Sequence, residues 1–341
     1  MVRRWIHVLV LLVCVGAGVA KWWIDHDLTL AAPVLDLAIE PGISPRRVAQ
    51  TAVQSGVSTS AVALYWWFRL SGQARQIKAG SYELAAGLTP RSLLSKLVRG
   101  EESLRAVALT DGLTFAQCRM ALAKADQLAQ DTQGLPSEVI MARLGRPGAY
   151  PEGRFFPDTY TYSKGSSDLS VLKRAMRAMD RHLTAAWQQR DPGLPLSSPD
   201  DALILASIIE KETGRASDRA MISAVFLNRL RAGMLLQTDP TVIYGMGDQF
   251  DGNLRRRDLQ TDTPWNTYTR AGLPPTPIAM PGQAALLAAV HPTDSQALYF
   301  VARGDGSSQF STTLSEHNRA VDLYQRTLKH VQKPLTYGPT P

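Results

Sequence analysis

The chain of 341 residues is 45% hydrophobic, with a formal net charge of +7 and a pI near 9.5. This length and composition exclude a disordered or low-complexity protein and suffice for two well-buried domains. The basic excess favours an anionic partner, such as a phospholipid surface or an acidic polymer. Because Lys and Arg are scattered without a block, a zinc-finger spacing or an RNA-binding signature, nucleic acid is not predicted as a partner.

The N-terminal residues 1–25 are predicted to form a short cytoplasmic tip and a transmembrane anchor. Arg3 and Arg4 precede an apolar run over Trp5–Ala20, and a lysine and a tryptophan pair follow it. Basic residues on one side and tryptophans on the other indicate a single-pass helix with its N-terminus in the cytoplasm. A cleaved signal peptide is the alternative, because Gly18-Val19-Ala20 resembles a small-residue cleavage site. In either case the rest of the chain is expected to be exported.

Cysteine and histidine usage argues against disulfide, metal and cofactor chemistry. Cys14 lies in the apolar run and Cys118 is the other cysteine, so the exported part cannot form an intrachain disulfide. The six histidines lack HExxH or other ligand spacing. The sequence also lacks a dinucleotide loop, a phosphate-binding loop and a serine nucleophile elbow. We therefore predict neither a metal site nor a cofactor.

Residues 34–100 show the pattern strand, helix, helix, strand, helix. Ser44 and Pro45 predict the start of the first helix, and Gly56 and Gly72 predict the ends of the first and second. This β-α-α-β unit resembles a LysM domain, a small fold that holds cell-wall glycan. A purely structural subdomain is the alternative, because fold alone does not define function.

The remainder is predicted to be a larger α+β domain. Residues 101–150 are interpreted as a connecting segment with one strand, one helix and a Pro- and Gly-rich passage that contains the domain boundary. Residues 151–335 form the predicted domain in which the candidate catalytic residues described below lie. It includes a long amphipathic helix over Asp168–Arg190, whose methionine and leucine stripe is interpreted as core.

Two glutamates, Glu210 and Glu212, lie at the end of an apolar helical run. Ser198 predicts the N-cap of this helix, and Gly214 predicts a left-handed stop. Because the two glutamates are two positions apart in the last turn, their side chains point in different directions and are not a side-by-side acid pair.

Periodicity does not choose between the two glutamates, because Ala202–Ile209 is apolar on every side. Glu212 has Arg215 three positions later, whereas Glu210 lacks a helical cation. A carboxyl in apolar surroundings tends to stay protonated, as a general acid must. This favours Glu210 as the acid, while a solvated helix-end glutamate is the alternative reading for both.

Five segments of the chain together resemble the endolytic murein transglycosylases of the YceG-like family. The segments are LASIIEKETG (Leu205–Gly214), PEGRFFPDTYTYSKG (Pro151–Gly165), VFLNRLRAGMLLQTDPTVIYGMG (Val225–Gly247), NTYTRAGLPPTPIAMPG (Asn266–Gly282) and HPTDSQALYFVARGDGSSQFSTTLSEHN (His291–Asn318). The similarity covers nearly the whole chain, including the N-terminal segment and the LysM-like unit.

The resemblance implies cleavage of the β-1,4 bond between N-acetylmuramic acid and N-acetylglucosamine in nascent peptidoglycan strands, leaving 1,6-anhydro-muramyl ends. It implies Glu210 as the acid/base. One carboxyl suffices for this reaction, since it can protonate the leaving oxygen and then accept the C6 hydroxyl proton. It also implies a single-pass protein of the bacterial inner membrane with a periplasmic catalytic domain that terminates strand elongation. Contact with a peptidoglycan synthase is a further hypothesis.

The other candidate site residues are interpreted around that proton transfer. Polar and aromatic side chains suited to binding sugar groups are Gln237, Thr238, Asp239, Thr241, Tyr244, Asn266 and Tyr268. Supporting roles are assigned to Glu212, Glu316, His317 and Asn318. Asx turns, aromatic packing and helix capping are the respective structural alternatives for these residues.

Two alternative functions follow from the same residues. A water-using muramidase would need a second carboxylate, for which Asp239 is the best candidate, and its product would have a reducing end. A non-catalytic scaffold would bind the cell wall through the LysM-like unit and aromatic residues, and Glu210→Gln would then leave its cellular role intact.

Overall fold

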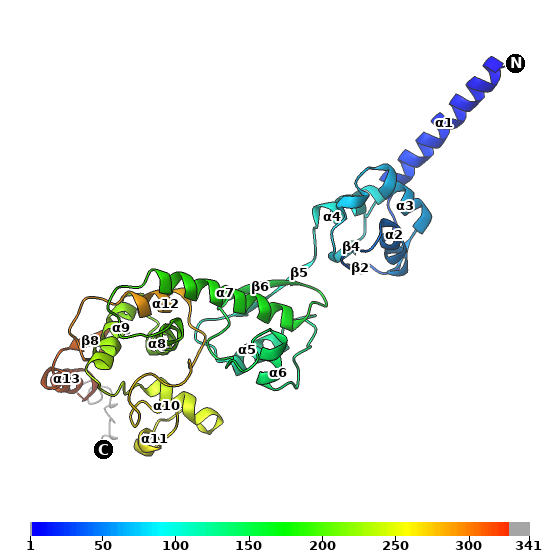
Figure 1. Cartoon of the computed structure of the whole chain (residues 1–341). Coiled ribbons are helices and arrows are strands. Elements are labelled where there is room, and N and C mark those ends of the chain that lie inside the picture. Colours follow the sequence, from blue (N-terminus) through cyan, green and yellow to red (C-terminus); the bar gives the residue numbers. More distant parts are fainter. Residues whose placement is uncertain (1, 327–341) are drawn as a thin grey trace, which may run out of the picture. The chain divides into compact units, whose positions relative to one another are not determined.

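The structure, a computed structural model, describes residues 2–326 (Figure 1). The chain divides into two compact units. Within the described residues, unit 1 contains 2–106, 126–128 and 161–166, and unit 2 contains 107–125, 129–160 and 167–326. Most of the stretch interpreted as a connecting segment therefore belongs to unit 2. The end of the predicted catalytic domain, residues 327–335, lies outside the described residues.

Unit 1 contains the small β-α-α-β arrangement expected for residues 34–100. Its elements are α1 (Val2–Asp25), β1 (Thr29–Leu30), β2 (Val34–Ile39), α2 (Pro45–Gln54), β3 (Val57–Ser58), α3 (Ala61–Leu70), η1 (Ala74–Gln76), β4 (Gly80–Ala85) and α4 (Pro90–Arg99). β2 pairs with β4 in antiparallel register, from Val34 opposite Ala85 to Ile39 opposite Gly80, and β1 pairs with β3. The LysM resemblance and its glycan-binding role stay predictions.

The sequence signals for the first helices of unit 1 are present in the structure. Ser44 caps α2, because its side chain accepts a hydrogen bond from the Arg47 amide, and Pro45 occupies the first turn. Gly56 and Gly72 lie two residues beyond the ends of α2 and α3, as predicted, with φ of 107° and 73°. Leucine, valine and aromatic side chains from α2, α3, α4, β2 and β4 form the core of this unit.

Helix α1 occupies the segment for which a membrane span was predicted. None of the helices in residues 2–326 is long and apolar enough to cross a membrane. The predicted span over Trp5–Ala20 is therefore not supported by the structure.

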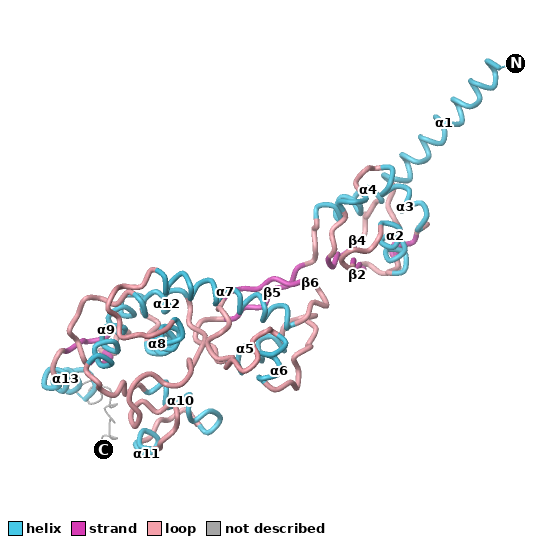
Figure 2. Tube along the Cα trace, in the orientation of Figure 1, coloured by secondary structure: helices cyan, strands magenta, loops and turns pink. Residues whose placement is uncertain are grey.

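Unit 2 is mainly helical, with two short sheets (Figure 2). Its elements are β5 (Leu104–Leu109), α5 (Phe115–Ala123), α6 (Ser137–Arg143), β6 (Asp158–Ser163), α7 (Asp168–Gln188), α8 (Pro199–Glu212), α9 (Ala216–Arg231), α10 (Asp239–Met246), η2 (Gly247–Gln249), α11 (Arg256–Gln260), α12 (Gln283–Val290), β7 (Tyr299–Ala302), β8 (Ser308–Ser311), α13 (Leu314–Val321) and η3 (Asp322–Arg326). β5 pairs with β6, and both strands contain residues of each unit. β7 and β8 form an antiparallel hairpin.

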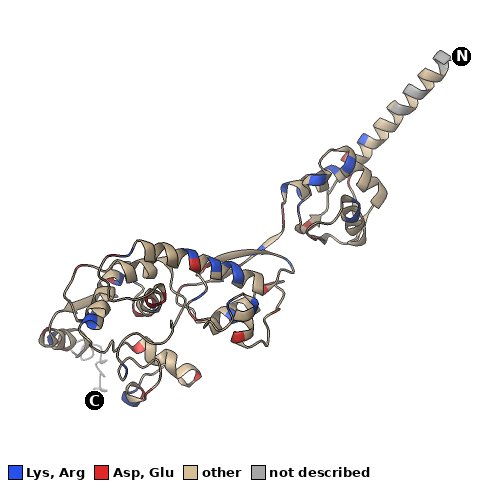
Figure 3. Cartoon of the chain, in the orientation of Figure 1, with Lys and Arg blue, Asp and Glu red and all other residues tan. Residues whose placement is uncertain are grey.

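Helix α7 confirms the predicted long amphipathic helix. Leu172, Met176, Met179 and Leu183 are buried, as the apolar stripe predicts. The opposite face is basic, and Figure 3 shows Lys and Arg grouped along this helix. These exposed residues are Lys173, Arg174, Arg177 and Arg181. Part of the net positive charge is therefore concentrated on one helix face.

Helix α8 lies in the middle of the main core. Ala202–Ile209 is buried all round, and α8 contacts α7, α9 and α12. Ser198 caps the helix as predicted, accepting a hydrogen bond from the Asp201 amide. The predicted left-handed stop at Gly214 is wrong. Thr213 leaves the helix with extended backbone, φ −148° and ψ 133°, so the chain needs no left-handed residue there.

Candidate active site

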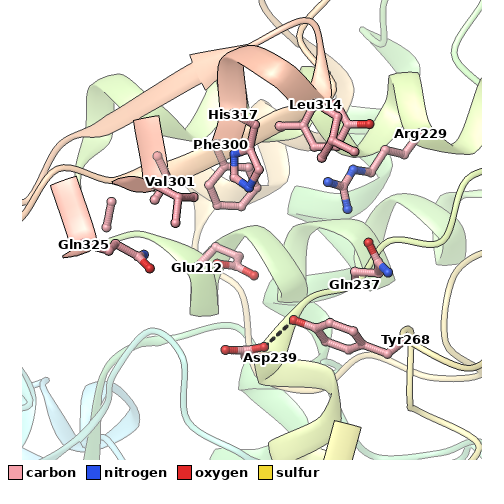
Figure 4. Close-up of a pocket in the computed structure, with 13 residues that line it drawn as sticks. Glu212, Arg229, Gln237, Asp239, Tyr268, Phe300, Val301, Leu314, His317 and Gln325 are labelled. Atoms are coloured by element: carbon pink, nitrogen blue, oxygen red, sulfur yellow. Dashed lines mark hydrogen bonds between the residues drawn. The ribbon is translucent and has the colours of Figure 1, made fainter. Parts of the chain in front are cut away.

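The C-terminal end of α8 borders a cavity of about 520 Å³ in unit 2 (Figure 4). The cavity combines charged, polar and aromatic side chains from α8, α9, the start of α10, the β7 strand and α13. Its lining residues are Glu212, Arg229, Gln237, Asp239, Tyr268, Tyr299, Phe300, Val301, Ala302, Leu314, His317, Val321 and Gln325.

Glu212 is the helix-end glutamate that lines this cavity. In Figure 4 its carboxyl lies between Phe300 and His317 on one side and Asp239 on the other. The Thr238 hydroxyl donates a hydrogen bond to Glu212 Oε1. Burial raises the pKa of Glu212 to about 7, and the Thr238 hydrogen bond opposes this rise. Glu212 can therefore hold or release a proton near neutral pH.

Three of the predicted sugar-binding residues line the same cavity: Gln237, Asp239 and Tyr268. The Tyr268 hydroxyl donates to Asp239 Oδ1 at 2.5 Å, which orients both side chains (Figure 4). Gln237 has φ of 49°, a backbone conformation that side-chain-bearing residues adopt at a cost of about 1–3 kcal/mol and that clusters at functional sites. These side chains are positioned to bind polar groups of a ligand beside Glu212.

Three other predicted sugar-binding residues are buried and build the framework beneath the cavity: Thr238, Thr241 and Asn266. Thr241 Oγ1 lies 2.9 Å from Thr267 Oγ1 and donates to the Thr238 carbonyl. Asn266 donates to the carbonyls of Leu259 and Thr261 and accepts from the Tyr268 amide, and it is fully buried. These contacts fix the segments that carry Asp239 and Tyr268.

Glu210 lies outside the residues that line this cavity. Its Oε2 accepts a hydrogen bond of 2.9 Å from the Gly282 amide, and its Oε1 is 3.8 Å from the Arg219 guanidinium. Burial raises the pKa of Glu210, as the sequence led us to expect, while the Gly282 hydrogen bond lowers it. Glu210 has no cation three or four positions further along the chain, and Arg219 of the following helix, α9, lies near its carboxyl instead.

The four remaining candidate residues lie in different places, and one of them lines the Glu212 cavity. Tyr244 lines a second cavity and donates to Glu152. Glu316 caps α13, accepting hydrogen bonds from the backbone amides of Thr312 and Thr313. His317 lines the Glu212 cavity, whereas Asn318 is exposed and is not among its lining residues. Helix capping, the structural alternative, therefore accounts for Glu316.

The sequence interpretation missed Arg229, Tyr299 and Phe300 as cavity residues. Arg229 is buried, donates to the carbonyls of Leu236 and Leu298 at 2.7 Å, and lies 5.3 Å from the Tyr299 ring centre. The available signal was a charged residue between Leu227 and Leu230, just after the buried and mainly apolar run Ile222–Leu227 of α9. Its pairing with β7 could not be inferred from that pattern.

Together, these groups could serve general acid–base chemistry, because a carboxyl with a pKa raised to about 7 lies in an open cavity with polar and aromatic walls. The YceG-like family model matches residues 37–323. The chain therefore belongs to the YceG-like family.

Two curated relatives and one solved structure are similar to this chain. An endolytic murein transglycosylase of Bacillus subtilis is 31% identical over 307 residues, covering 85% of this chain and 84% of the relative. One of Streptococcus pneumoniae is 25% identical and covers 84% of this chain but 57% of its own length. A crystal structure of a yceG-like protein from Listeria monocytogenes is 28% identical, with a TM-score of 0.52, and covers 84% of this chain and 98% of that chain.

Proposed function

We propose that this protein is a lyase, an endolytic murein transglycosylase with Glu212 as its acid/base. Membership of the YceG-like family and the names of the two curated relatives support murein as the substrate. The observation that supports Glu212 is its position in the cavity with Gln237, Asp239 and Tyr268. The sequence-based choice of Glu210 is revised accordingly, because Glu210 is engaged by Gly282 and Arg219 away from these residues.

The proposed reaction uses the Glu212 carboxyl twice. Its proton passes to the glycosidic oxygen between N-acetylmuramic acid and N-acetylglucosamine as the bond to muramyl C1 breaks. The resulting carboxylate then accepts the proton of the muramyl C6 hydroxyl while that oxygen bonds to C1, which closes the 1,6-anhydro ring. The proton is returned to Glu212, and no water is consumed. A carboxyl with a pKa of about 7 is suited to both transfers near neutral pH.

One observation favours a muramidase as the second candidate. Asp239 lines the same cavity as Glu212, so a second carboxylate is available to activate water. The two reactions differ in their products, since hydrolysis leaves a reducing muramyl end and transglycosylation leaves an anhydro end. Mass spectrometry of products from the full-length protein and uncrosslinked strands distinguishes them. Anhydro ends support the transglycosylase, and reducing ends would establish the hydrolase instead.

The acid role predicts a pH profile for cleavage. Because Glu212 must be protonated to donate, kcat/KM is expected to fall about tenfold for each pH unit above its pKa of about 7. In Thr238→Val the hydrogen bond that lowers this pKa is lost, so the fall is expected to begin at a higher pH. The measurement is kcat/KM against pH for both proteins. Glu210→Gln is the control and should keep the wild-type profile; a profile that moves in this variant but not in Thr238→Val would argue against Glu212.

The cellular setting stays a set of proposals. A periplasmic catalytic unit would have access to nascent strands, and cleavage there would terminate their elongation. Longer glycan strands in cells producing Glu212→Gln than in wild-type cells would support the termination role, and unchanged lengths would contradict it.

Contact with a peptidoglycan synthase is tested by crosslinking and copurification, and failure to recover any synthase would count against it.

A further inference from the structure

A second cavity of about 650 Å³ lies within unit 2, apart from the Glu212 site. Its walls come from α5, α6, the Tyr150–Glu152 segment, α10, η2 and Trp265. Aromatic residues are frequent among them: Phe115, Tyr150, Tyr244, Phe250 and Trp265. Unlike a buried core, the cavity is open, and Tyr150 is 45% exposed. Phe115 is buried and stacks on Phe155, whereas the other four rings are exposed or half-buried and are available to a ligand.

A buried carboxyl and two tyrosine hydroxyls form a polar chain in this cavity. Glu152 is only 4% exposed; its Oε1 accepts from the Phe115 amide at 2.9 Å. Its Oε2 accepts from the Tyr244 hydroxyl at 3.1 Å, and that hydroxyl lies 3.2 Å from the Tyr150 hydroxyl. These polar contacts lead from the buried carboxyl of Glu152 through Tyr244 to the half-exposed ring of Tyr150. It therefore offers oriented hydroxyl groups to a polar ligand beside apolar ring faces.

Two pieces of chain that line the Glu212 cavity also line the second cavity. Helix α10 supplies Asp239 to the first and Tyr244 to the second, five residues and about 7.5 Å further along its axis. The following segment supplies Tyr268 to the first and Trp265 to the second. The buried contact between Thr241 and Thr267 joins these two pieces of chain. Residues close together on the same two pieces of chain therefore line both cavities.

We propose that the second cavity is a distal subsite that binds sugar residues of the same glycan strand, away from the bond that is cleaved. This inference rests on the proposed function. The apolar face of a pyranose ring packs on aromatic side chains, while its hydroxyl and acetamido groups pair with hydroxyl and carboxyl groups. A polysaccharide is the occupant because the cavity has both kinds of wall and shares α10 with the acid site. Binding there would favour long strands over short ones.

The first test compares substrates of different length. Tyr150→Ala and Phe250→Ala remove rings from the cavity, and Val139→Ala on neighbouring α6 changes an exposed residue that does not line it. For each full-length protein, kcat/KM is measured on long uncrosslinked strands and on a murein tetrasaccharide. The ratio of the two values is expected to fall about five- to tenfold in the ring variants. It should stay at the wild-type value in Val139→Ala; an unchanged ratio in both ring variants would overturn the proposal.

The second test measures binding without cleavage, so that a failure of the subsite is distinguished from a failure of the catalytic assignment. Calorimetric titration of Glu212→Gln with peptide-free glycan strands is compared with the same titration of Glu212→Gln/Tyr150→Ala. Weaker binding in the double variant supports the subsite, whatever the activity of either protein. Equal binding would overturn it. Displacement of strands from the Tyr150-dependent site by free stem peptide would also overturn it, because the site would then recognise the peptide instead of the sugar.

Discussion

Glu212→Gln is expected to reduce the release of anhydro-muramyl ends by about 10³-fold, while Glu210→Gln retains activity within about tenfold of wild type. The reason is that glutamine keeps the shape of the side chain but cannot donate and recover a proton. Only Glu212 lies in the cavity with the other polar candidates, whereas Glu210 contacts the Gly282 amide and Arg219. Mass spectrometry of strands incubated with each purified protein gives the measurement.

The two glutamates provide a matched control, because they occupy the same last turn of α8 and undergo the same substitution. Circular dichroism and thermal unfolding would show that both variants fold. Loss of anhydro ends in Glu210→Gln with full activity in Glu212→Gln would restore the choice made from the sequence. Full activity in both variants would contradict the single-carboxyl mechanism.

Asn266→Ala is expected to lower the free energy of unfolding by about 3 kcal/mol. The side chain is fully buried and bonds the carbonyls of Leu259 and Thr261 and the Tyr268 amide. Alanine would leave these buried backbone groups without their partner, and Tyr268 would lose the contact that fixes its position. Urea unfolding followed by tryptophan fluorescence measures the change.

The exposed Asn253 provides the control for this substitution. Asn253→Ala is expected to change the free energy of unfolding by less than about 0.5 kcal/mol. The sequence interpretation gave Asn266 a direct contact with sugar, and the two roles have different signatures. Wild-type stability with a raised KM in Asn266→Ala would favour the sugar contact and contradict the framework role.

The elements with strong local signals could be predicted from the sequence. Ser44 and Pro45 mark the start of α2, Gly56 and Gly72 mark the ends of α2 and α3, and the apolar stripe of α7 identifies its buried face. Each signal depends on neighbours within a few positions. Helix α10 was missed, because the short polar run at its start is equally typical of a turn before a strand.

The choice between Glu210 and Glu212 needed contacts that are remote in the sequence. The run Ala202–Ile209 is buried all round, so periodicity gives no direction to the residues that follow it. Arg215 was taken as the helical partner of Glu212, yet the structure brings Thr238 to that carboxyl and Arg219 to Glu210. Tertiary packing, which places the loop before α10 against the end of α8, decides which carboxyl borders a cavity.

The same limit applies to the predicted sugar-binding cluster. Gln237, Thr238, Asp239 and Thr241 are adjacent in sequence, but their side chains divide between the cavity and the buried framework. Composition indicates that such a stretch is suited to polar contacts. It does not tell which members face a ligand and which hold the backbone, because that division follows from the turn and the start of α10.

Helix α8 ends at Glu212, and this polarity has an electrostatic consequence. The unpaired carbonyls of the last turn give that end of a helix a partial negative charge, which opposes a second negative charge nearby. If the same glutamate lay in the first turn, the exposed amides there would lower its pKa and favour the carboxylate. The direction in which the chain runs through the core thus favours the protonated form of Glu212, the proposed acid, independently of the side chains that surround it.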